Sequence, residues 1–319
     1  MPAIHATGLR RNFGETVAVA GLDLEIAAGE IFGLVGPDGA GKTTTIRMLT
    51  GVLRPDAGTA EVAGCDVVRE SGRLKDQIGY LSQRFGLYPD LTVRENIEFY
   101  ADIYGVASQG RAEKIAQLLG FSNLMPFQQR LAGDLSGGMK QKLGLACALI
   151  HTPRVLFLDE PTNGVDPVSR RDFWRILYQL VREGVTLFVS TAYLDEAERC
   201  NRLALLHQGQ VVGLGTPEEI KALMPGALLE VRTSAPRRTA ALLRDRLADA
   251  TVGLFGDRVH VATRDVAAAK SQARAAIAAA GFELQSIRAI APSLEDVFVS
   301  VLATQAPQGS HPTTMSLIR

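Results

Sequence analysis

Residues 36–44 read Gly36-Pro37-Asp38-Gly39-Ala40-Gly41-Lys42-Thr43-Thr44, and this stretch decides the fold of the chain. It fits the pattern G-x-x-x-x-G-K-[ST], in which backbone N–H groups surround nucleotide phosphates, the lysine reaches the β- and γ-phosphates and the next hydroxyl binds Mg²⁺. The apolar run 30–35 predicts a buried strand, and residues 44–49 predict a helix whose positive end faces the anion. Because strand, loop and helix occur in that order, we predict a nucleotide site there rather than a chance glycine turn.

The composition excludes several classes of protein. The 319 residues carry 34 basic and 34 acidic side chains, so no net charge draws the chain to nucleic acid or to an anionic membrane. Residues 1–6 lack a secretory signal, and no apolar run approaches the roughly 18 residues of a membrane-spanning helix. Cys65, Cys147 and Cys200 are far apart, which favours reduced thiols over disulfides or a metal site. A cytosolic globular protein is expected.

Residues 1–224 are expected to form the larger domain. Alternating apolar and polar positions at 3–26 predict antiparallel strands. Buried strands at 78–83, 155–158 and 186–190 then alternate with helices, which predicts an α/β fold with a parallel sheet covered on both faces. A helical subdomain is expected at about 84–150.

The pattern changes after residue 224. Residues 225–303 follow the order strand, helix, strand, strand, helix, strand, which predicts a small α+β domain of the split-βαβ type. Residues 304–319 contain Pro307, Gly309 and Pro312 and are expected to be a disordered tail.

Two carboxylates follow the apolar strand at 155–158. Asp159 and Glu160 would stand at its carboxyl end, where open α/β sheets bind ligands. Asp159 can hold Mg²⁺ through water, and Glu160 can polarise an attacking water molecule. An acidic helix cap would explain the pair alone, but the phosphate loop in the same sheet favours the chemical role.

Residues 135–141, Leu135-Ser136-Gly137-Gly138-Met139-Lys140-Gln141, discriminate between families. A capped helix start needs the serine but not two glycines, which cost helix stability. At this stretch the sequence resembles the nucleotide-binding subunit of ABC transporters, whose signature reads LSGGQ or, in drug-export members, LSGGM. The resemblance covers about residues 3–220, with aromatic loop, phosphate loop, Q-loop, signature, carboxylate strand and D-loop in the family order. It implies a P-loop ABC ATPase cassette with a RecA-like parallel sheet, an antiparallel β-layer and a helical subdomain.

The resemblance implies an ATPase that uses Mg²⁺, and it assigns roles to single residues. Phe13 would stack on the adenine, although alone it is more typical of a core. Gln83 would contact the Mg²⁺ site and sense the membrane partner, although alone it is more typical of a solvated surface. The implied catalytic residues are Glu160, Lys42 and Gln83, and the implied metal ligands are Thr43, Gln83 and Asp159. The implied ATP contacts are Phe13, Gly36, Pro37, Asp38, Gly39, Ala40, Gly41, Lys42, Thr43, Thr44, Gln83 and Asp159, with Ser136, Gly137 and Gly138 reaching the γ-phosphate on the opposite subunit.

The same resemblance implies a particular assembly. ATP would be buried between two cassettes arranged head to tail, and Asp166 would cross their interface. Hydrolysis would release the cassettes and move membrane subunits docked near residues 84–95.

Two positions depart from the family pattern. The family has a histidine after the Ser-Thr pair that ends at Thr191, and this chain has Ala192 there. Loss of one preorganised transition-state donor costs about 10²–10³ in rate, so slow hydrolysis is expected at this site. If the strand alternation continued, Tyr193 would point away from the site. Asp38 stands where many members have asparagine, and we expect it to point outward or to pair with a cation.

A second resemblance concerns the class of transporter. Residues 292–298, Pro292-Ser293-Leu294-Glu295-Asp296-Val297-Phe298, resemble a segment at the end of DrrA-type drug-export ATPases, and residues 35–42, 135–145 and 190–198 resemble the first cassette of a tandem exporter ATPase. This class implies an ABC-2-type membrane permease, export of drugs or other lipophilic compounds, and a peripheral position on the cytoplasmic face of the cell membrane.

A single cassette implies a second one, in a hetero- or homodimer, and no nucleic acid is expected as a partner. Two alternatives stay open. One is a soluble ABC ATPase acting on nucleic acid or the ribosome, for which a tandem chain, a coiled-coil insertion or basic arms would be expected. The other is a non-hydrolysing regulatory cassette.

Overall fold

The structure is a computed structural model that describes residues 2–83, 86–224 and 226–305. The chain divides between Leu214 and Gly215 into two compact units. This division precedes the expected boundary, because α8 (Pro217–Lys221) packs against α11 (Leu294–Gln305) of the second unit. Of the expected tail, residues 304 and 305 belong to α11 and the rest lies outside the described residues.

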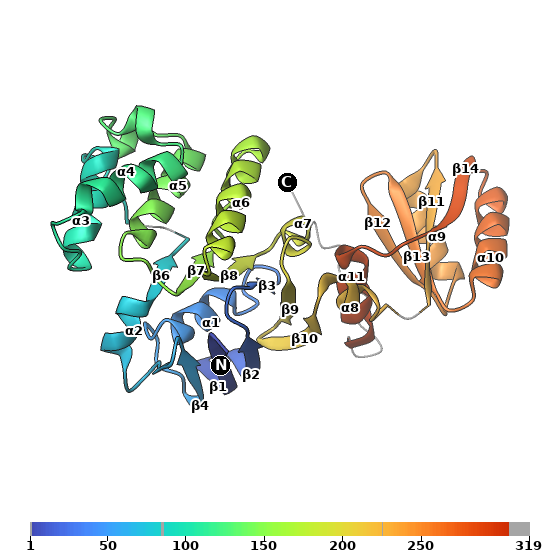
Figure 1. Cartoon of the computed structure of the whole chain (residues 1–319). Coiled ribbons are helices and arrows are strands. Elements are labelled where there is room, and N and C mark those ends of the chain that lie inside the picture. Colours follow the sequence, from blue (N-terminus) through green and yellow to red (C-terminus); the bar gives the residue numbers. More distant parts are fainter. Residues whose placement is uncertain (1, 84–85, 225, 306–319) are drawn as a thin grey trace. The chain divides into compact units, whose positions relative to one another are not determined.

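The first unit is built on a six-stranded sheet with the order β10-β9-β3-β8-β7-β6 (Figure 1). Strand β3 pairs in parallel with β8 and β9, and β7 pairs in parallel with β6 and β8. The parallel pairing confirms the α/β prediction and brings the carboxyl ends of these strands to one edge. The strands are β3 (Ile31–Val35), β6 (Ile78–Leu81), β7 (Val155–Asp159), β8 (Thr186–Thr191), β9 (Arg202–His207) and β10 (Gln210–Gly215).

A four-stranded antiparallel sheet with the order β2-β1-β4-β5 lies in the same unit. Its strands are β1 (Ile4–Phe13), β2 (Thr16–Ile26), β4 (Ala57–Val62) and β5 (Cys65–Asp66). Residue Ile4 pairs with Ile26, and buried residues alternate with exposed ones along the second half of β2. The period of two therefore predicted this hairpin correctly.

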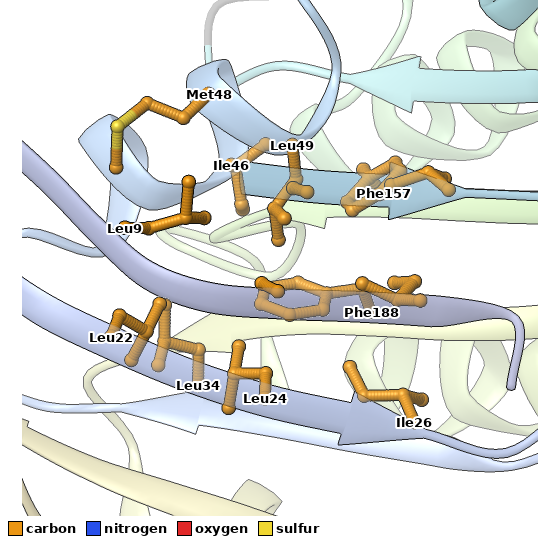
Figure 2. Close-up of a cluster of buried hydrophobic side chains, with 14 of the residues drawn as sticks. Leu9, Leu22, Leu24, Ile26, Leu34, Ile46, Met48, Leu49, Phe157 and Phe188 are labelled. Atoms are coloured by element: carbon orange, nitrogen blue, oxygen red, sulfur yellow. The ribbon is translucent and has the colours of Figure 1, made fainter. Parts of the chain in front are cut away.

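Both faces of the six-stranded sheet are covered. Phe157 and Phe188 enter a core shared with the antiparallel sheet and with α1 (Lys42–Leu49), as Figure 2 shows. The alternate residues Leu156 and Leu158 pack in a second core with Trp174 of α6 (Pro167–Arg182). Continuous apolar strands such as β7 are typical of a sheet buried on both faces.

Helices α3 (Val93–Ile103), α4 (Arg111–Phe121) and α5 (Gly137–Leu149) gather into the predicted helical subdomain, in which Ile97, Leu119 and Leu143 are fully buried (Figure 1). Thr92 begins α3 with a capping box: the Thr92 hydroxyl accepts from the Glu95 N–H, and the Glu95 carboxylate accepts from the Thr92 N–H. The short 3₁₀ turns η1 (Met125–Phe127) and η2 (Ala132–Asp134) connect α4 to α5, and the remaining helices are α2 (Ser71–Gln77) and α7 (Leu194–Ala197).

The second unit has the predicted strand and helix order. Its antiparallel sheet runs β12-β13-β11-β14, and α9 and α10 pack on one face, where Leu243 and Ile277 meet Leu229, Val231 and Val261. The elements are β11 (Ala227–Thr233), α9 (Pro236–Arg246), β12 (Thr251–Phe255), β13 (Arg258–Thr263), α10 (Val266–Ala279) and β14 (Leu284–Ile290). This is the split-βαβ arrangement.

Asp296 fastens α11 to this sheet. One carboxylate oxygen lies 2.6 Å from His260 Nδ1 on β13, and the other accepts from the Ser293 N–H and hydroxyl at 2.9 and 2.6 Å. Burial alone would raise the pKa of Asp296, but the hydrogen bonds from His260 and Ser293 outweigh burial and hold that pKa below its usual value. The segment that resembles drug-export ATPases thus has a structural role here.

Replacing Asp296 with asparagine is expected to destabilise the second unit by about 1–3 kcal/mol at neutral pH, because His260 then loses its charged partner. The folded pKa is depressed, so the stabilisation is complete above the unfolded pKa and is lost as pH falls below the unfolded pKa and through the folded one. Urea unfolding of the full chain by circular dichroism should therefore show a gap between wild type and variant that closes on acidification. A gap that is constant over this range would contradict the assignment.

Candidate functional site: the phosphate loop and the carboxyl ends of β3, β7 and β8

The phosphate loop lies between β3 and α1, and α1 begins at Lys42. Gly41 precedes it with φ 109°, and a Cβ there would come within 2.3 Å of the Ala18 carbonyl oxygen. Only glycine fits this position. The Gly36 N–H donates to the Thr191 carbonyl at 3.2 Å, which places the loop beside the end of β8.

Lys42 is the centre of the site. Its side chain is only 4% exposed, and Nζ donates to the Gly36 and Pro37 carbonyls at 2.8 and 3.1 Å. Nζ also lies 3.0 Å from Glu160 Oε1. The Asp38 carboxylate is 94% exposed and 4.0 Å from Nζ, in agreement with the expected outward orientation near a cation.

Thr43 and Asp159 form a second cluster beside Lys42. The Thr43 hydroxyl donates to Asp159 Oδ1 at 3.1 Å, and the Ser190 hydroxyl donates to the same oxygen at 2.7 Å. Asp159 is 1% exposed, and among the described residues its Oδ2 has no hydrogen-bond partner. Burial and then the negative charge of Asp159 raise the pKa of Tyr80, while Arg47 acts in the opposite direction. A buried carboxylate oxygen without a donor, next to a hydroxyl, suits a hard cation such as Mg²⁺.

Glu160 follows Asp159 with φ 51°, in the left-handed region that is uncommon for this residue type. Its N–H donates to the Ser190 carbonyl and hydroxyl oxygens at 3.2 and 3.0 Å. Its Oε2 accepts from Gln83 Nε2 at 3.0 Å and from Asn163 Nδ2 at 3.3 Å. The structure therefore brings Lys42, Gln83 and Glu160 together.

The segment after β8 corrects one expectation. Tyr193 does not point away, because its hydroxyl donates to Asn163 Oδ1 at 3.4 Å. Strand β8 ends at Thr191, so the alternation on which the expectation depended stops two residues earlier. The Tyr193 N–H instead donates to the Thr191 hydroxyl at 3.0 Å, which turns the chain back toward the site.

The signature residues lie elsewhere in the unit. Ser136 is the N-cap of α5, and its hydroxyl accepts from the Met139 N–H. A Cβ at Gly138 would come within 2.6 Å of the Ser169 side chain, at the start of α6. In the part of the chain that the structure describes, no hydrogen bond or ion pair joins Ser136, Gly137 or Gly138 to the phosphate loop.

Phe13 ends β1 and is 50% exposed, with the Arg11 guanidinium 5.1 Å from its ring centroid. Its hairpin approaches the phosphate loop, because the Ala18 carbonyl lies against Gly41. An exposed phenylalanine on this hairpin differs from the core position that is more typical of the residue.

Sequence reasoning missed two residues of the site. The Ser190 hydroxyl donates to the Asp159 carboxylate and accepts from the Glu160 backbone N–H, and the Asn163 amide donates to the Glu160 carboxylate. A signal existed for Ser190, because it is a polar residue directly after the apolar run 187–189 of β8. Asn163 comes three residues after Glu160, and this short separation was the one sign in the sequence that the two side chains could meet.

Comparison with known proteins gives a consistent result. A family model described as ABC transporter matches residues 19–163. The chain is 51% identical over 225 residues to the probable multidrug ABC transporter ATP-binding protein YbhF of Escherichia coli K12; the match covers 70% of this chain but only 39% of YbhF. It is 36% identical over 299 residues to the daunorubicin resistance ATP-binding protein DrrA3 of Streptomyces coeruleorubidus, covering 93% of this chain and 95% of that protein.

A solved structure agrees in fold. A dimeric ATP-binding cassette in a post-hydrolysis state, bound to ADP and phosphate, matches with a TM-score of 0.61 at 25% identity, covering 67% of this chain and 98% of that one. The predicted cassette fold and the resemblance read from the motifs are both confirmed. This chain belongs to the family of ABC transporter ATP-binding proteins.

Proposed function

We propose that this chain is the ATP-binding and ATP-hydrolysing subunit of an ABC-2-type exporter. The observation that carries the proposal is the convergence of Lys42, Thr43, Asp159 and Glu160 at the carboxyl ends of β3 and β7. Relatives named for multidrug transport and daunorubicin resistance support export of drugs or other lipophilic compounds.

Each residue of the site has a defined task in ATP hydrolysis. Lys42 and the loop 36–44 bind the phosphates, and Phe13 stacks on the adenine. Thr43 and Asp159, with Gln83, would hold Mg²⁺, and the ion would neutralise the negative charge that develops on the phosphates. Glu160 orients the attacking water and accepts its proton. The feature that supports this metal site is the buried Asp159 Oδ2, which has no hydrogen-bond partner within the described part of the chain.

A second cassette completes the site. Gly137 and Gly138 lie beside the segment 164–169, as the Gly138–Ser169 approach indicates, and Ser136 precedes them as the N-cap of α5. We infer that they serve the ATP of a partner cassette, and the dimeric relative bound to ADP and phosphate supports this arrangement. Because Ala192 supplies no side-chain donor, we further propose that hydrolysis is slow in this chain's own half-site and faster in the site that its signature completes.

Exposed apolar side chains on the helical subdomain support docking to a membrane permease. Tyr88 and Leu131 are 45% and 44% exposed. Their segments run side by side, because the Ala132 N–H donates to the Leu91 carbonyl at 2.9 Å. Exposed apolar groups on neighbouring segments are typical of a protein interface. Residues 84 and 85 of the expected docking segment lie outside the described residues.

Among the helices that the structure describes, none has both the length and the apolar character needed to cross a bilayer. We propose a peripheral position on the cytoplasmic face of the membrane, held there by the permease.

The experiment that tests this function compares ATP hydrolysis by the purified chain with that of Lys42→Ala and Ala192→His variants. We expect slow turnover that Lys42→Ala abolishes and Ala192→His raises. Fast turnover of the unmodified chain, unchanged by the histidine, would contradict the slow half-site. Co-purification with a detergent-solubilised permease is expected, whereas salt-sensitive retention of RNA or DNA would favour a soluble ATPase that acts on nucleic acid.

A further inference from the structure

Three side chains contact the Glu160 carboxylate, and they differ in whether the proposed function gives them a second task. Oε1 pairs with Lys42 at 3.0 Å, and Oε2 accepts from Gln83 at 3.0 Å and from Asn163 at 3.3 Å. Under the proposed function Lys42 also binds phosphate and Gln83 also contacts Mg²⁺. Asn163 has neither task, so it is the donor that can stay on Glu160 throughout the reaction.

The Asn163 amide is itself oriented. Its Nδ2 donates to Glu160, and its Oδ1 accepts from the Tyr193 hydroxyl at 3.4 Å. A flipped amide would set its oxygen against the Glu160 carboxylate, which cannot donate, so the carboxylate fixes the amide orientation and leaves Oδ1 to accept from the Tyr193 hydroxyl. The Asn163 N–H also donates to the Glu160 carbonyl at 3.1 Å, which places both residues in one tight turn.

Tyr193 is held in place by its surroundings. The Arg170 guanidinium lies 4.5 Å from the centroid of its ring, within the range of a cation–π contact. Arg170 Nε lies 3.5 Å from a carboxylate oxygen of Glu196, which is fully buried. Glu196 also accepts from the hydroxyls of Thr162 and Thr191, so it joins the loop after β7 to the loop after β8.

We propose that Asn163 is the positioning residue that orients Glu160 toward the attacking water, and that Tyr193 orients Asn163. This inference rests on the proposed function, because it gives Glu160 the role of proton acceptor. The polarity of the chain is consistent from end to end: hydroxyl to amide oxygen, then amide N–H to carboxylate. A carboxylate with such a donor keeps one direction, and misplacement of a catalytic group by about 1 Å can cost about 10²-fold in rate.

The test is single-turnover hydrolysis of radiolabelled ATP by the full chain, with ATP affinity measured in parallel. Asn163→Ala is expected to lower the hydrolysis rate by about ten- to a hundredfold, with less than about a threefold change in ATP affinity. Asn163→Asp preserves the volume but replaces the donor with a negative oxygen, so it should lower the rate at least as much. Tyr193→Phe keeps the ring on Arg170 and removes only the hydroxyl, so a loss of about two- to tenfold is expected.

A double-mutant cycle separates positioning from packing. If Tyr193 acts through Asn163, the Asn163→Ala/Tyr193→Phe variant should be no slower than Asn163→Ala alone. Tyr178→Phe, which removes the hydroxyl of a different tyrosine, on α6, is the matched control and should leave the rate unchanged.

The outcomes distinguish the inference from the proposed function. Hydrolysis that Lys42→Ala abolishes but Asn163→Ala leaves intact would overturn the inference alone, as would multiplicative losses in the double variant. An Asn163→Asp variant as fast as wild type would show that volume matters and the donor does not. Absence of hydrolysis in every variant, wild type included, would overturn both.

Discussion

Replacing Glu160 with glutamine is expected to slow ATP hydrolysis by about 10²–10⁴-fold while ATP remains bound. The amide keeps the shape of the side chain but cannot accept a proton from water. The substitution also removes the anion that lies 3.0 Å from Lys42 Nζ. Because ATP phosphates would compete with that anion for Lys42, affinity for ATP should stay the same or increase. Single-turnover hydrolysis and equilibrium binding of a fluorescent ATP analogue measure the two effects separately.

Two controls accompany this substitution. Lys42→Ala should lose ATP binding itself, because it removes the cation that meets the phosphates. Glu61→Gln changes an exposed acid on β4 and should change neither quantity. A Glu160→Gln variant that hydrolyses ATP at the wild-type rate would show that Glu160 is not the proton acceptor, and one that fails to bind ATP would contradict the competition between Glu160 and the phosphates for Lys42.

Truncating Phe157 to alanine is expected to lower the free energy of unfolding of the first unit by about 3–5 kcal/mol. The ring is fully buried, and its centroid lies 5.4 Å from that of Phe188 (Figure 2). Phe157 also precedes Asp159 by two residues on β7, so a cavity there would loosen the strand that delivers both carboxylates. The loss should therefore appear in stability first and in activity second.

The chain offers a specific probe for this measurement. Its single tryptophan, Trp174, is buried in the first unit, so urea unfolding followed by tryptophan fluorescence reports on that unit. Phe13→Ala is the matched control, because it removes the same side chain at a half-exposed position and should cost far less stability. A loss below about 1 kcal/mol for Phe157→Ala, or equal losses for both variants, would contradict the account of this core.

Local patterns predicted the elements well, for identifiable reasons. The glycines of 36–41 and the alternation of 3–26 are short-range signals, and each acts through backbone conformation or the burial of one face. The second unit was predicted for the same reason, because each of its strands and helices shows its own period. The boundary at Leu214 was harder to predict from the sequence, because it depends on the packing of α8 against α11.

Residue types and motif order alone determined the nucleotide loop, the carboxylate strand and the family, because those functions need particular chemical groups at fixed short spacings. Only the tertiary structure decided which of these groups contact one another. It placed Lys42 beside Glu160, left one oxygen of Asp159 without a hydrogen-bond partner among the described residues, and turned Tyr193 toward Asn163. The physical reason is that these contacts join segments after different strands, β3, β7 and β8, which meet only when parallel pairing brings the carboxyl ends of the strands together.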